Sequence, residues 1–416
     1  MNLQIQKSIF KAQNSILKIT GSKSETNRLL LLQALYPNVI LENTSNSDDS
    51  EVMIDALQKS KIKDQKSLIV DVHHAGTAMR FLTAFFAIQE GKEIILTGSS
   101  RMKERPIKIL VEALQQLGAE ITYEENEGFP PIRIIGRKLE KNKVSLPANV
   151  SSQYISALLL IAPKLENGVE LTLEGEITSI PYIKMTLALL NEIGVANSFQ
   201  NNTIIVTSSA VEMPSKKLTI ESDWSSASYW YSIIALSQIG TKITLSSYKK
   251  DSLQGDSAVV EIYKDFGVET VFEDNSITIS KSGNCKLQSV TCNLQSSPDI
   301  AQTIAVTCFG LGIGCHLTGL HTLKIKETDR LEALKTELTK LGATIFVTND
   351  SLTIEQSINL NSNVEISTYQ DHRMAMAFAP LALKVPIIIN DAEVVSKSYP
   401  TFWEDLKNVG FQVEKE

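Results

Sequence analysis

The fold class is indicated first by residues 111–136, VEALQQLGAEITYEENEGFPPIRIIG. An apolar run at helical spacing ends at Gly118, where a helix commonly closes on a residue of left-handed conformation. A short strand, a polar turn and a second strand follow. The segment therefore predicts a helix, a terminating glycine and a pair of strands.

The same pattern recurs at residues 187–206, 260–280 and 334–354, and a truncated copy ends the chain at 403–416. The glycines that follow the helices are Gly118, Gly194, Gly267, Gly342 and Gly410. The copies lie roughly 70–75 residues apart, too far for a solenoid repeat, so each is interpreted as a folding unit. Residues 53–62 with 67–72 suggest an earlier, sixth copy.

Length and composition narrow the class of protein. A chain of 416 residues is too long for one core and predicts two or three domains. The net charge of −7 argues against a general nucleic-acid binder, but a local cluster of cations could still bind a small anion. The N-terminus resembles no targeting peptide, no stretch is long and apolar enough for a membrane span, and four widely spaced cysteines suggest free thiols in a cytoplasmic protein.

Polar residues gather at seven expected helix starts, near Ser24, Thr77, Pro106, Ser152, Asp299, Arg330 and His372. A helix N-terminus offers free N–H groups and a partial positive charge, and therefore favours anions. We expect Pro106 to occupy a first helical position, which places Arg105 at the mouth of that helix. Cations at several such mouths predict a ligand with more than one phosphate or carboxylate.

Each of these residues also has a purely structural interpretation. Ser152 and Thr77 are ordinary capping residues, and Ser296 with Asp299 resembles a capping box. Glu327 and Arg330 could form a surface ion pair, and Lys23 could be a solvated lysine. No metal or organic cofactor is expected, because nucleotide-binding, nucleophile-elbow and zinc-protease motifs are absent and the five histidines show no metal-ligand spacing.

The segments that carry a family resemblance are GSKSETNR, AGTAMR, RMKERP, VSSQY, SIPYIKMT, DWSSASYW, LQGD, PDIAQT, IKETDR, YQDHRMAM and KSYPTF. In this order, from residue 21 to residue 402, they resemble the signature segments of the 5-enolpyruvylshikimate-3-phosphate synthases, a family of enolpyruvyl transferases. The resemblance implies an α/β fold of two similar domains, each of three βαβαββ units in an inside-out barrel, with the active site in the interdomain cleft. It implies domains at 20–222 and at 1–19 with 223–416.

The resemblance also implies a reaction: phosphoenolpyruvate donates its enolpyruvyl group to the 5-hydroxyl of shikimate 3-phosphate, and phosphate leaves. Such an addition–elimination needs an acid, a base and several fixed cations between two anionic substrates. Asp299 is expected to be the base and Glu327 the acid, and Lys23, His372 and Lys397 complete the implied catalytic set. Taken alone, His372 is more often a structural histidine.

The remaining roles are carried over from the family onto matching positions. The implied shikimate 3-phosphate ligands are Lys23, Ser24, Arg28, Ser151, Ser152, Gln153, Ser179, Tyr182, Asp299 and Lys326. The implied phosphoenolpyruvate ligands are Lys23, Gly76, Arg105, Gln153, Arg330, Arg373 and Lys397. A monomer without nucleic-acid or membrane partners is the family expectation.

Three positions depart from the family pattern. His74 stands where Asn is usual, Phe81 replaces a Pro, and Thr322 occupies a position that is often Asn. These changes bear on the pocket near Gly76, and hence on sensitivity to the inhibitor glyphosate, which we expect to be retained. The sister enzyme that uses UDP-N-acetylglucosamine is a rival, disfavoured by Ser24 after Lys23 and by RMKERP without Cys. A non-catalytic anion binder is a second rival.

Overall fold

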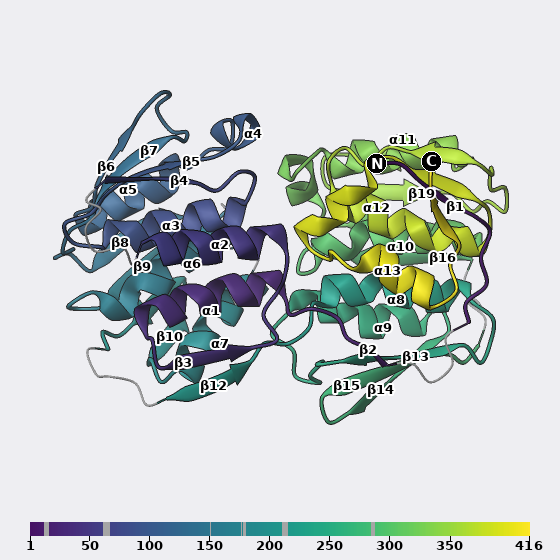
Figure 1. Ribbon diagram of the computed structural model, residues 1–416, viewed down its shortest axis with the longest axis horizontal. Coiled ribbons are helices and arrows are strands. Elements are labelled where there is room, and N and C mark those ends of the chain that lie inside the picture. Colours follow the sequence, from purple (N-terminus) through teal and green to yellow (C-terminus); the bar gives the residue numbers. More distant parts are fainter. Residues whose placement is uncertain are drawn as a thin grey trace. The chain divides into compact units, whose positions relative to one another are not determined.

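The computed structural model describes residues 1–11, 16–60, 67–149, 151–175, 177, 180–209, 215–283 and 288–416. The chain forms two compact units, which are shown in Figure 1. The first contains both termini and comprises Met1–Gly21 and Glu221–Glu416, and we call it the terminal unit. The second is the intervening stretch Ser22–Ile220, which we call the inserted unit.

The helices of the inserted unit are α1 (Lys23–Leu35), α2 (Asp48–Lys59), α3 (Gly76–Ala87), α4 (Ser100–Lys103), α5 (Lys108–Leu117), α6 (Ser152–Ile161), η1 (Ala162–Lys164) and α7 (Ile180–Glu192). Its strands are β3 (Val39–Glu42), β4 (Ser67–Asp71), β5 (Glu93–Thr97), β6 (Glu120–Tyr123), β7 (Ile132–Ile135), β8 (Lys143–Pro147), β9 (Val169–Glu174), β10 (Asn197–Gln200), β11 (Thr203–Val206) and β12 (Lys216–Thr219). They form sheets in the orders β4-β5-β7-β6, β10-β11-β9-β8 and β12-β3.

The helices of the terminal unit are α8 (Trp224–Leu236), η2 (Gly255–Ala258), α9 (Val259–Lys264), η3 (Pro298–Ile300), α10 (Ala301–Leu311), η4 (His321–Ile325), α11 (Arg330–Lys340), α12 (His372–Phe378), η5 (Ala379–Leu383), η6 (Ala392–Lys397) and α13 (Phe402–Asn408). Its strands are β1 (Leu3–Ile5), β2 (Ile16–Leu17), β13 (Lys242–Ser246), β14 (Val268–Glu273), β15 (Ser276–Lys281), β16 (Ser289–Asn293), β17 (Gly314–Thr318), β18 (Ile345–Val347), β19 (Leu352–Ile354), β20 (Val364–Ile366), β21 (Ile387–Ile389) and β22 (Val413–Lys415). The sheet orders are β20-β21-β1-β22, β14-β15-β13-β2 and β16-β17-β19-β18.

Each four-stranded sheet repeats one pairing scheme. In the sheet of β4 to β7, β4 and β5 are parallel, while β7 is antiparallel to both β5 and β6. The sheet of β16 to β19 is built in the same way. The prediction of an α/β fold with three βαβαββ units in each half is confirmed, although the third unit of the inserted half has only the parallel pair β12 and β3 among its described strands.

The suggested sixth copy of the repeat is wrong as a helix–strand–strand segment. Residues 67–72 contain β4, but β4 lies parallel to β5 and is therefore the first strand of the following unit. Residues 61–66 lie outside the described part of the chain. The apolar pattern of a short strand does not reveal its partner, because partner choice depends on the whole sheet.

The predicted helix-ending glycines are confirmed. Their φ angles are 105° at Gly118, 91° at Gly194, 75° at Gly267, 106° at Gly342 and 102° at Gly410. Residues with a Cβ are disfavoured in this left-handed region, so glycine closes the helix and turns the chain into the next strand at little cost.

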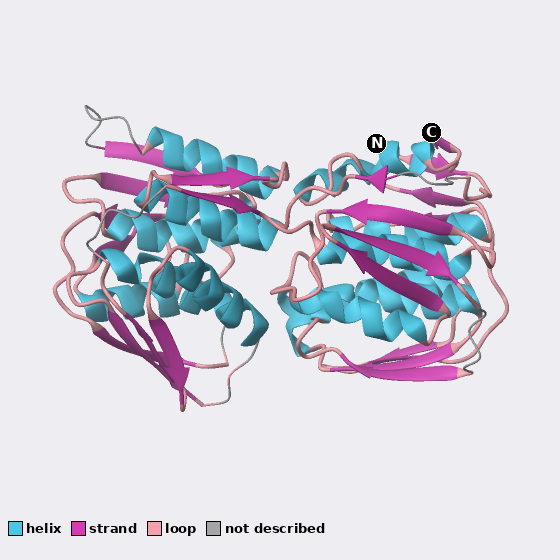
Figure 2. Ribbon diagram, turned by 90° about the horizontal axis from the view of Figure 1, so that it is seen from below, coloured by secondary structure: helices cyan, strands magenta, loops and turns pink. Residues whose placement is uncertain are grey.

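The core of each unit is helical, and the sheets lie outside it, as Figure 2 shows. In α8, every residue from Trp224 to Leu236 is buried. A helix that is buried on all sides lies in the interior, whereas the strands alternate between buried and less buried residues, as in β15 and β9. This arrangement leaves the helix N-termini available for polar residues at the edge of the core.

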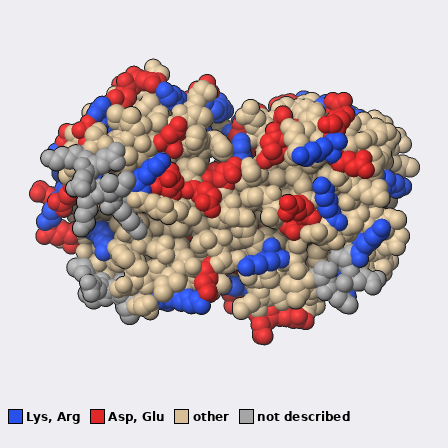
Figure 3. Space-filling view, in the orientation of Figure 1, with Lys and Arg blue, Asp and Glu red and all other residues tan. Residues whose placement is uncertain are grey.

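None of the helices in the described residues combines the length and apolarity needed to cross a membrane. The surface carries both signs of charge, and Figure 3 shows acidic and basic side chains interspersed over one face.

Candidate functional site

In the terminal unit, three helix starts carry most of the predicted site residues. Asp299 lies in η3, directly before α10, and Arg330 is the first residue of α11. His372 and Arg373 open α12, behind the capping residue Asp371. Because α10 packs against both α11 and α12, these three starts come together.

Arg330 is the centre of this cluster. Its Nε donates to Asp371 Oδ2 at 2.6 Å, its Nη1 donates to Asp299 Oδ1 at 2.8 Å, and its Nη2 donates to Glu327 Oε2 at 2.8 Å. The side chain is only 1% exposed, so the interpretation of Glu327 and Arg330 as a surface ion pair is wrong. Burial alone would lower the pKa of the Arg330 guanidinium, but Asp371, Glu327 and Asp299 raise it above its ordinary value.

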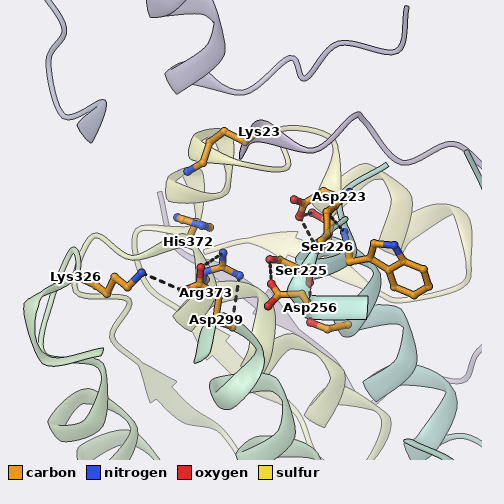
Figure 4. A network of polar contacts seen from close by, with 12 residues as sticks. Lys23, Asp223, Ser225, Ser226, Asp256, Asp299, Lys326, His372 and Arg373 are labelled. Atoms are coloured by element: carbon orange, nitrogen blue, oxygen red, sulfur yellow. Dashed lines mark hydrogen bonds and ion pairs between the residues drawn. The ribbon is translucent and has the colours of Figure 1, made fainter. Parts of the chain in front are cut away.

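Asp299 contacts three cations, as Figure 4 shows in part. Besides Arg330, Arg373 Nη2 lies 3.3 Å from Asp299 Oδ2, and Lys326 Nζ lies 3.5 Å from Oδ1. The residue before η3 is Ser297, and its side chain makes no capping bond. Because the N-cap is Ser297 and not Ser296, the spacing of the expected capping box with Asp299 is not kept. The Asp299 carboxylate contacts the cations.

A further buried carboxylate, Asp256 of η2, belongs to the same network (Figure 4). Its Oδ2 accepts a hydrogen bond from Ser225 Oγ. Burial, together with the negative charge of Asp299, raises the pKa of Asp256 to about 7, and Arg373 opposes that rise. Asp256 lies in the LQGD segment of the family resemblance, but the local pattern of that segment predicts no role for it.

The raised pKa makes a prediction about stability. In the native protein Asp256 keeps a proton that the unfolded chain releases near its ordinary pKa of 3.8. The native state therefore binds more protons than the unfolded state between about pH 4 and pH 7, and the free energy of unfolding falls as the pH rises through this range. In Asp256→Asn the free energy of unfolding should therefore fall by about 2–4 kcal/mol less than in wild type over this pH range.

The measurement is urea unfolding of wild type and Asp256→Asn at pH 5 and pH 8. Asp265→Asn, a change at an exposed carboxylate, is the matched control. Equal pH dependence in wild type and Asp256→Asn would contradict a protonated Asp256 in the native state.

His372 and Lys397 complete the predicted set in the terminal unit. His372 is 2% exposed and is the first residue of α12. Lys397 closes η6, and its Nζ donates to the carbonyl oxygen of Gln370 at 2.7 Å. Thr322, one of the departures from the family pattern, is half-buried in η4.

In the inserted unit, Arg28 on α1 is buried and 2% exposed. Its Nε donates to Thr186 Oγ1 at 2.8 Å, and its Nη2 donates to Ser156 Oγ at 3.0 Å. Nη1 donates to the carbonyl oxygen of Ser24 at 2.8 Å, so the expected proximity of Ser24 and Arg28 one helical turn apart is confirmed.

Two aromatic rings flank Arg28, which explains how the chain tolerates this buried cation. The Arg28 Cζ lies 5.4 Å from the ring centroid of Phe81 and 5.8 Å from that of Tyr182. Burial lowers the pKa of Arg28 to about 10, which still leaves it charged at neutral pH. Phe81, another departure from the family pattern, is thus a structural partner of a predicted substrate ligand.

The start of helix α6 carries the predicted ligands Ser151, Ser152 and Gln153. Ser151 is its N-cap, and the Ser151 Oγ accepts from the Gln153 backbone N at 3.3 Å. The cap is therefore Ser151 and not Ser152. Gln153 Nε2 donates to Thr77 Oγ1 at 3.0 Å, which ties the start of α6 to that of α3.

Three further predicted ligands of this part of the chain are Ser179, Tyr182 and Lys23. Ser179 lies outside the described residues, whereas Tyr182 lies in α7. Lys23 is the first residue of α1, behind the N-cap Ser22, and its Nζ lies 3.4 Å from Asp49 Oδ2. The interpretation of Lys23 as a solvated lysine is therefore wrong, since it is 22% exposed and ion-paired.

The structure corrects the expectation for Pro106. Helix α5 begins at Lys108 with Ile107 as its N-cap, so Pro106 precedes the helix instead of occupying its first position. Arg105 consequently lies in the short connection between α4 and α5. A Cβ at Gly76 would lie 2.5 Å from Arg105 Nη1, so the Arg105 guanidinium is packed directly on the first residue of α3.

Arg80 is a buried cation for which the sequence predicted no role in the site. Its Nη1 donates to the carbonyl oxygen of Gly76 at 3.1 Å, and its Nη2 donates to that of Pro106 at 3.1 Å. Burial, with Arg105 nearby, lowers the pKa of Arg80 to about 10. Arg80 thus holds the start of α3 and the segment that carries Arg105 in register.

Each unit therefore presents a cluster of cations at helix starts, and the terminal unit adds the carboxylates Asp299 and Glu327. Among the described residues, no group of three or more His, Cys, Asp or Glu is placed to hold a metal ion. The terminal cluster can bind an anion through Arg330, Arg373 and Lys397 and can exchange protons through its carboxylates.

Comparison with known proteins gives consistent results over nearly the whole chain. The family described as EPSP synthase (3-phosphoshikimate 1-carboxyvinyltransferase) matches residues 8–406. A 3-phosphoshikimate 1-carboxyvinyltransferase of Bacteroides fragilis strain YCH46 is 46% identical over 404 residues, which cover 96% of each chain. One from Colwellia psychrerythraea is 37% identical, covering 95% of this chain and 97% of its own.

Solved structures agree on the fold. EPSP synthase from Acinetobacter baumannii superimposes with a TM-score of 0.80 at 21% identity over 100% of both chains. The enolpyruvyl transferase NikO from Streptomyces tendae gives a TM-score of 0.76 at 13% identity, covering 99% of this chain and 98% of its own.

Proposed function

Because this chain belongs to the EPSP synthase (3-phosphoshikimate 1-carboxyvinyltransferase) family, we propose that it transfers the enolpyruvyl group of phosphoenolpyruvate to the 5-hydroxyl of shikimate 3-phosphate and releases phosphate. The observation that carries this proposal within the structure is the cluster around Arg330. One buried guanidinium there orders two carboxylates that can exchange protons, Asp299 and Glu327. Under this proposal the inserted unit corresponds to the enolpyruvyl transferase domain expected at 20–222, and the terminal unit to the one expected at 1–19 with 223–416.

Asp299 and Glu327 would divide the proton transfers. Asp299 takes the proton of the 5-hydroxyl as its oxygen attacks C2 of phosphoenolpyruvate, and Glu327 protonates the methylene carbon. The product of this addition is a tetrahedral intermediate that still carries the phosphate. The Glu327 carboxylate, having given up its proton, then takes one from the new methyl group, and departure of phosphate restores the C=C bond as the enol ether. Both carboxylates bond to the same guanidinium, which holds them in a fixed relation.

The cations would hold the two anionic substrates. In the terminal unit Arg330, Arg373 and Lys397 are proposed to bind phosphoenolpyruvate, with His372 beside them, while Lys326 contacts a shikimate hydroxyl. Residues of the inserted unit proposed for shikimate 3-phosphate are Lys23, Ser24, Arg28, Ser151, Ser152, Gln153, Ser179 and Tyr182. Lys23, Gly76, Arg105 and Gln153 of that unit are proposed to reach phosphoenolpyruvate as well. Fixed cations lower the cost of placing two anions together.

The experiment that tests the activity is phosphate release by the purified protein given phosphoenolpyruvate and one of two acceptors. Release with shikimate 3-phosphate and none with UDP-N-acetylglucosamine is the expected result. The sister activity on the nucleotide sugar is not favoured, because the matching family and the curated relatives carry the shikimate name. Binding of shikimate 3-phosphate without phosphate release would mean a non-catalytic binder.

Gly76→Ala is expected to raise the KM for phosphoenolpyruvate about tenfold, with a smaller effect on kcat, because the new methyl displaces the Arg105 guanidinium. Initial rates at varied phosphoenolpyruvate measure the effect. Gly283→Ala is the matched control, since a Cβ there meets no atom within 4 Å. An unchanged KM would exclude a role for Arg105 in binding this substrate.

Inhibition by glyphosate is proposed because Gly76 is the small residue expected of sensitive members. Unchanged turnover at glyphosate concentrations that stop a sensitive family member would refute it.

A cytoplasmic monomer is also proposed, on the basis of the family expectation. Sedimentation tests whether the protein is a monomer, and cell fractionation tests whether it is cytoplasmic.

A further inference from the structure

The segment before α12 contains a tight turn with an unfavourable backbone. The Asp371 N donates to the Thr368 carbonyl oxygen at 2.8 Å, and the two residues between them both have positive φ, 54° at Tyr369 and 55° at Gln370. Positive φ at both central positions is a property of type I′ turns, which favour Asn-Gly. Tyr and Gln are disfavoured there, so other contacts must hold the turn in place.

Those contacts come from Glu337 on α11, a carboxylate that the proposed mechanism does not use. Its side chain is 0% exposed. Glu337 Oε1 accepts from the Tyr369 hydroxyl at 2.7 Å, and Oε2 accepts from the Ser367 backbone N at 3.2 Å. Lys340 Nζ also donates to this carboxylate, at 2.7 and 2.9 Å. Glu337 therefore binds the segment just before the turn and the first central residue of the turn.

The last two residues of the turn, Gln370 and Asp371, bond to the proposed phosphoenolpyruvate ligands. The Gln370 carbonyl oxygen accepts from Lys397 Nζ at 2.7 Å. The Asp371 carboxylate accepts from Arg330 Nε at 2.6 Å and from the Arg373 backbone N at 2.9 Å. All three cations of the terminal unit that are proposed to bind phosphoenolpyruvate are thus tied to residues 370 and 371, whose position depends on the turn.

We propose that Glu337 and Tyr369 are positioning residues, which hold the 368–371 turn in its left-handed conformation and thereby aim Arg330, Arg373 and Lys397 at phosphoenolpyruvate. This inference rests on the proposed function. Neither residue needs to touch the substrate, since the effect passes through the backbone of Gln370 and Asp371. The 2.7 Å bond from the Tyr369 hydroxyl to the buried Glu337 carboxylate joins the first central residue of the turn to α11.

Tyr369→Phe removes the phenol hydroxyl, which bonds to Glu337 and also interacts with Thr336, and leaves the ring in place. We expect the KM for phosphoenolpyruvate to rise about five- to tenfold with kcat within about twofold of wild type, which corresponds to the loss of one hydrogen bond to a charged group. Hydrogen exchange in a peptide spanning residues 367–376 should become about tenfold faster, because the turn opens more often.

A rescue variant separates positioning from stability. Tyr369→Asn/Gln370→Gly lacks the phenol but carries the residues that type I′ turns prefer, so its KM should return to within about twofold of wild type. Lys340→Met is the matched control: it removes a partner of the same carboxylate and leaves the Tyr369 bond in place. Its KM should not change even if the protein is less stable.

The outcomes distinguish this inference from the proposed function. A wild-type protein that releases no phosphate overturns both. An active wild type with an unchanged KM in Tyr369→Phe overturns the inference alone, whether or not exchange becomes faster. Failure of the Asn-Gly variant to recover a raised KM would also overturn it, because the tyrosine would then act other than through the turn.

Discussion

Arg330→Gln is expected to lower the free energy of unfolding by about 3–5 kcal/mol, because it removes one partner of a buried ion network. The carboxylates of Asp371, Asp299 and Glu327 all accept hydrogen bonds from this guanidinium. Asp371 is 0% exposed, and without Arg330 it would be a buried carboxylate that has lost its closest cation. Binding of phosphoenolpyruvate should be lost as well.

Chemical denaturation and calorimetric titration with phosphoenolpyruvate measure the two effects. The matched control is Arg101→Gln, which breaks an exposed pair with Glu104 in which Arg101 is 63% exposed. Exposed pairs contribute about 0–1 kcal/mol, so this change should hardly alter stability. If the free energy of unfolding falls no more in Arg330→Gln than in the control, the three carboxylates reorganise and do not depend on the guanidinium.

Asp299→Asn is expected to lower kcat for phosphate release by about 10³-fold, within the range that general acid–base groups contribute. Asparagine keeps the shape of the side chain and can still accept the bond from Arg330 Nη1, but it cannot take the proton of the 5-hydroxyl. The effect should appear in kcat more than in the affinity for phosphoenolpyruvate.

Asp329→Asn is a control of the same chemistry in the neighbouring stretch. Asp329 caps α11 by accepting from the backbone N of Leu331 and Glu332 at 3.1 and 3.2 Å, and asparagine is an equally good cap. We expect this variant to retain activity. Asp299→Asn with wild-type kcat in single-turnover phosphate release would show that another group is the base.

Local patterns in the sequence were sufficient for much of the fold. Gly118 and its four counterparts have positive φ, because the requirement for glycine at a helix end depends only on neighbouring residues. The helix starts at Gly76 and Ser152 also follow from local polarity. Two local predictions were wrong, because they depend on tertiary packing. Pro106 precedes its helix, and β4 pairs with β5 of the following unit.

The candidate site could be predicted as a set of residues, but their partners could not. Asp299 and Asp371 are separated from Arg330 by 31 and 41 residues, and only the packing of α10 against α11 and α12 joins them. The role of Asp256 depends likewise on Ser225, which is 31 residues away. No pattern at Tyr369-Gln370 indicates a left-handed turn, because Glu337 imposes it from another helix.

By itself, the sequence determined the repeated α/β units, the helix-ending glycines and the identity of the polar residues at the helix starts, because these depend on backbone preferences over a few residues. Only the tertiary structure decided which carboxylate contacts which cation. It also decided that the pKa of Asp256 is raised and that the Phe81 ring packs against Arg28. Burial and distance control charge–charge interactions, and both are properties of the packed chain.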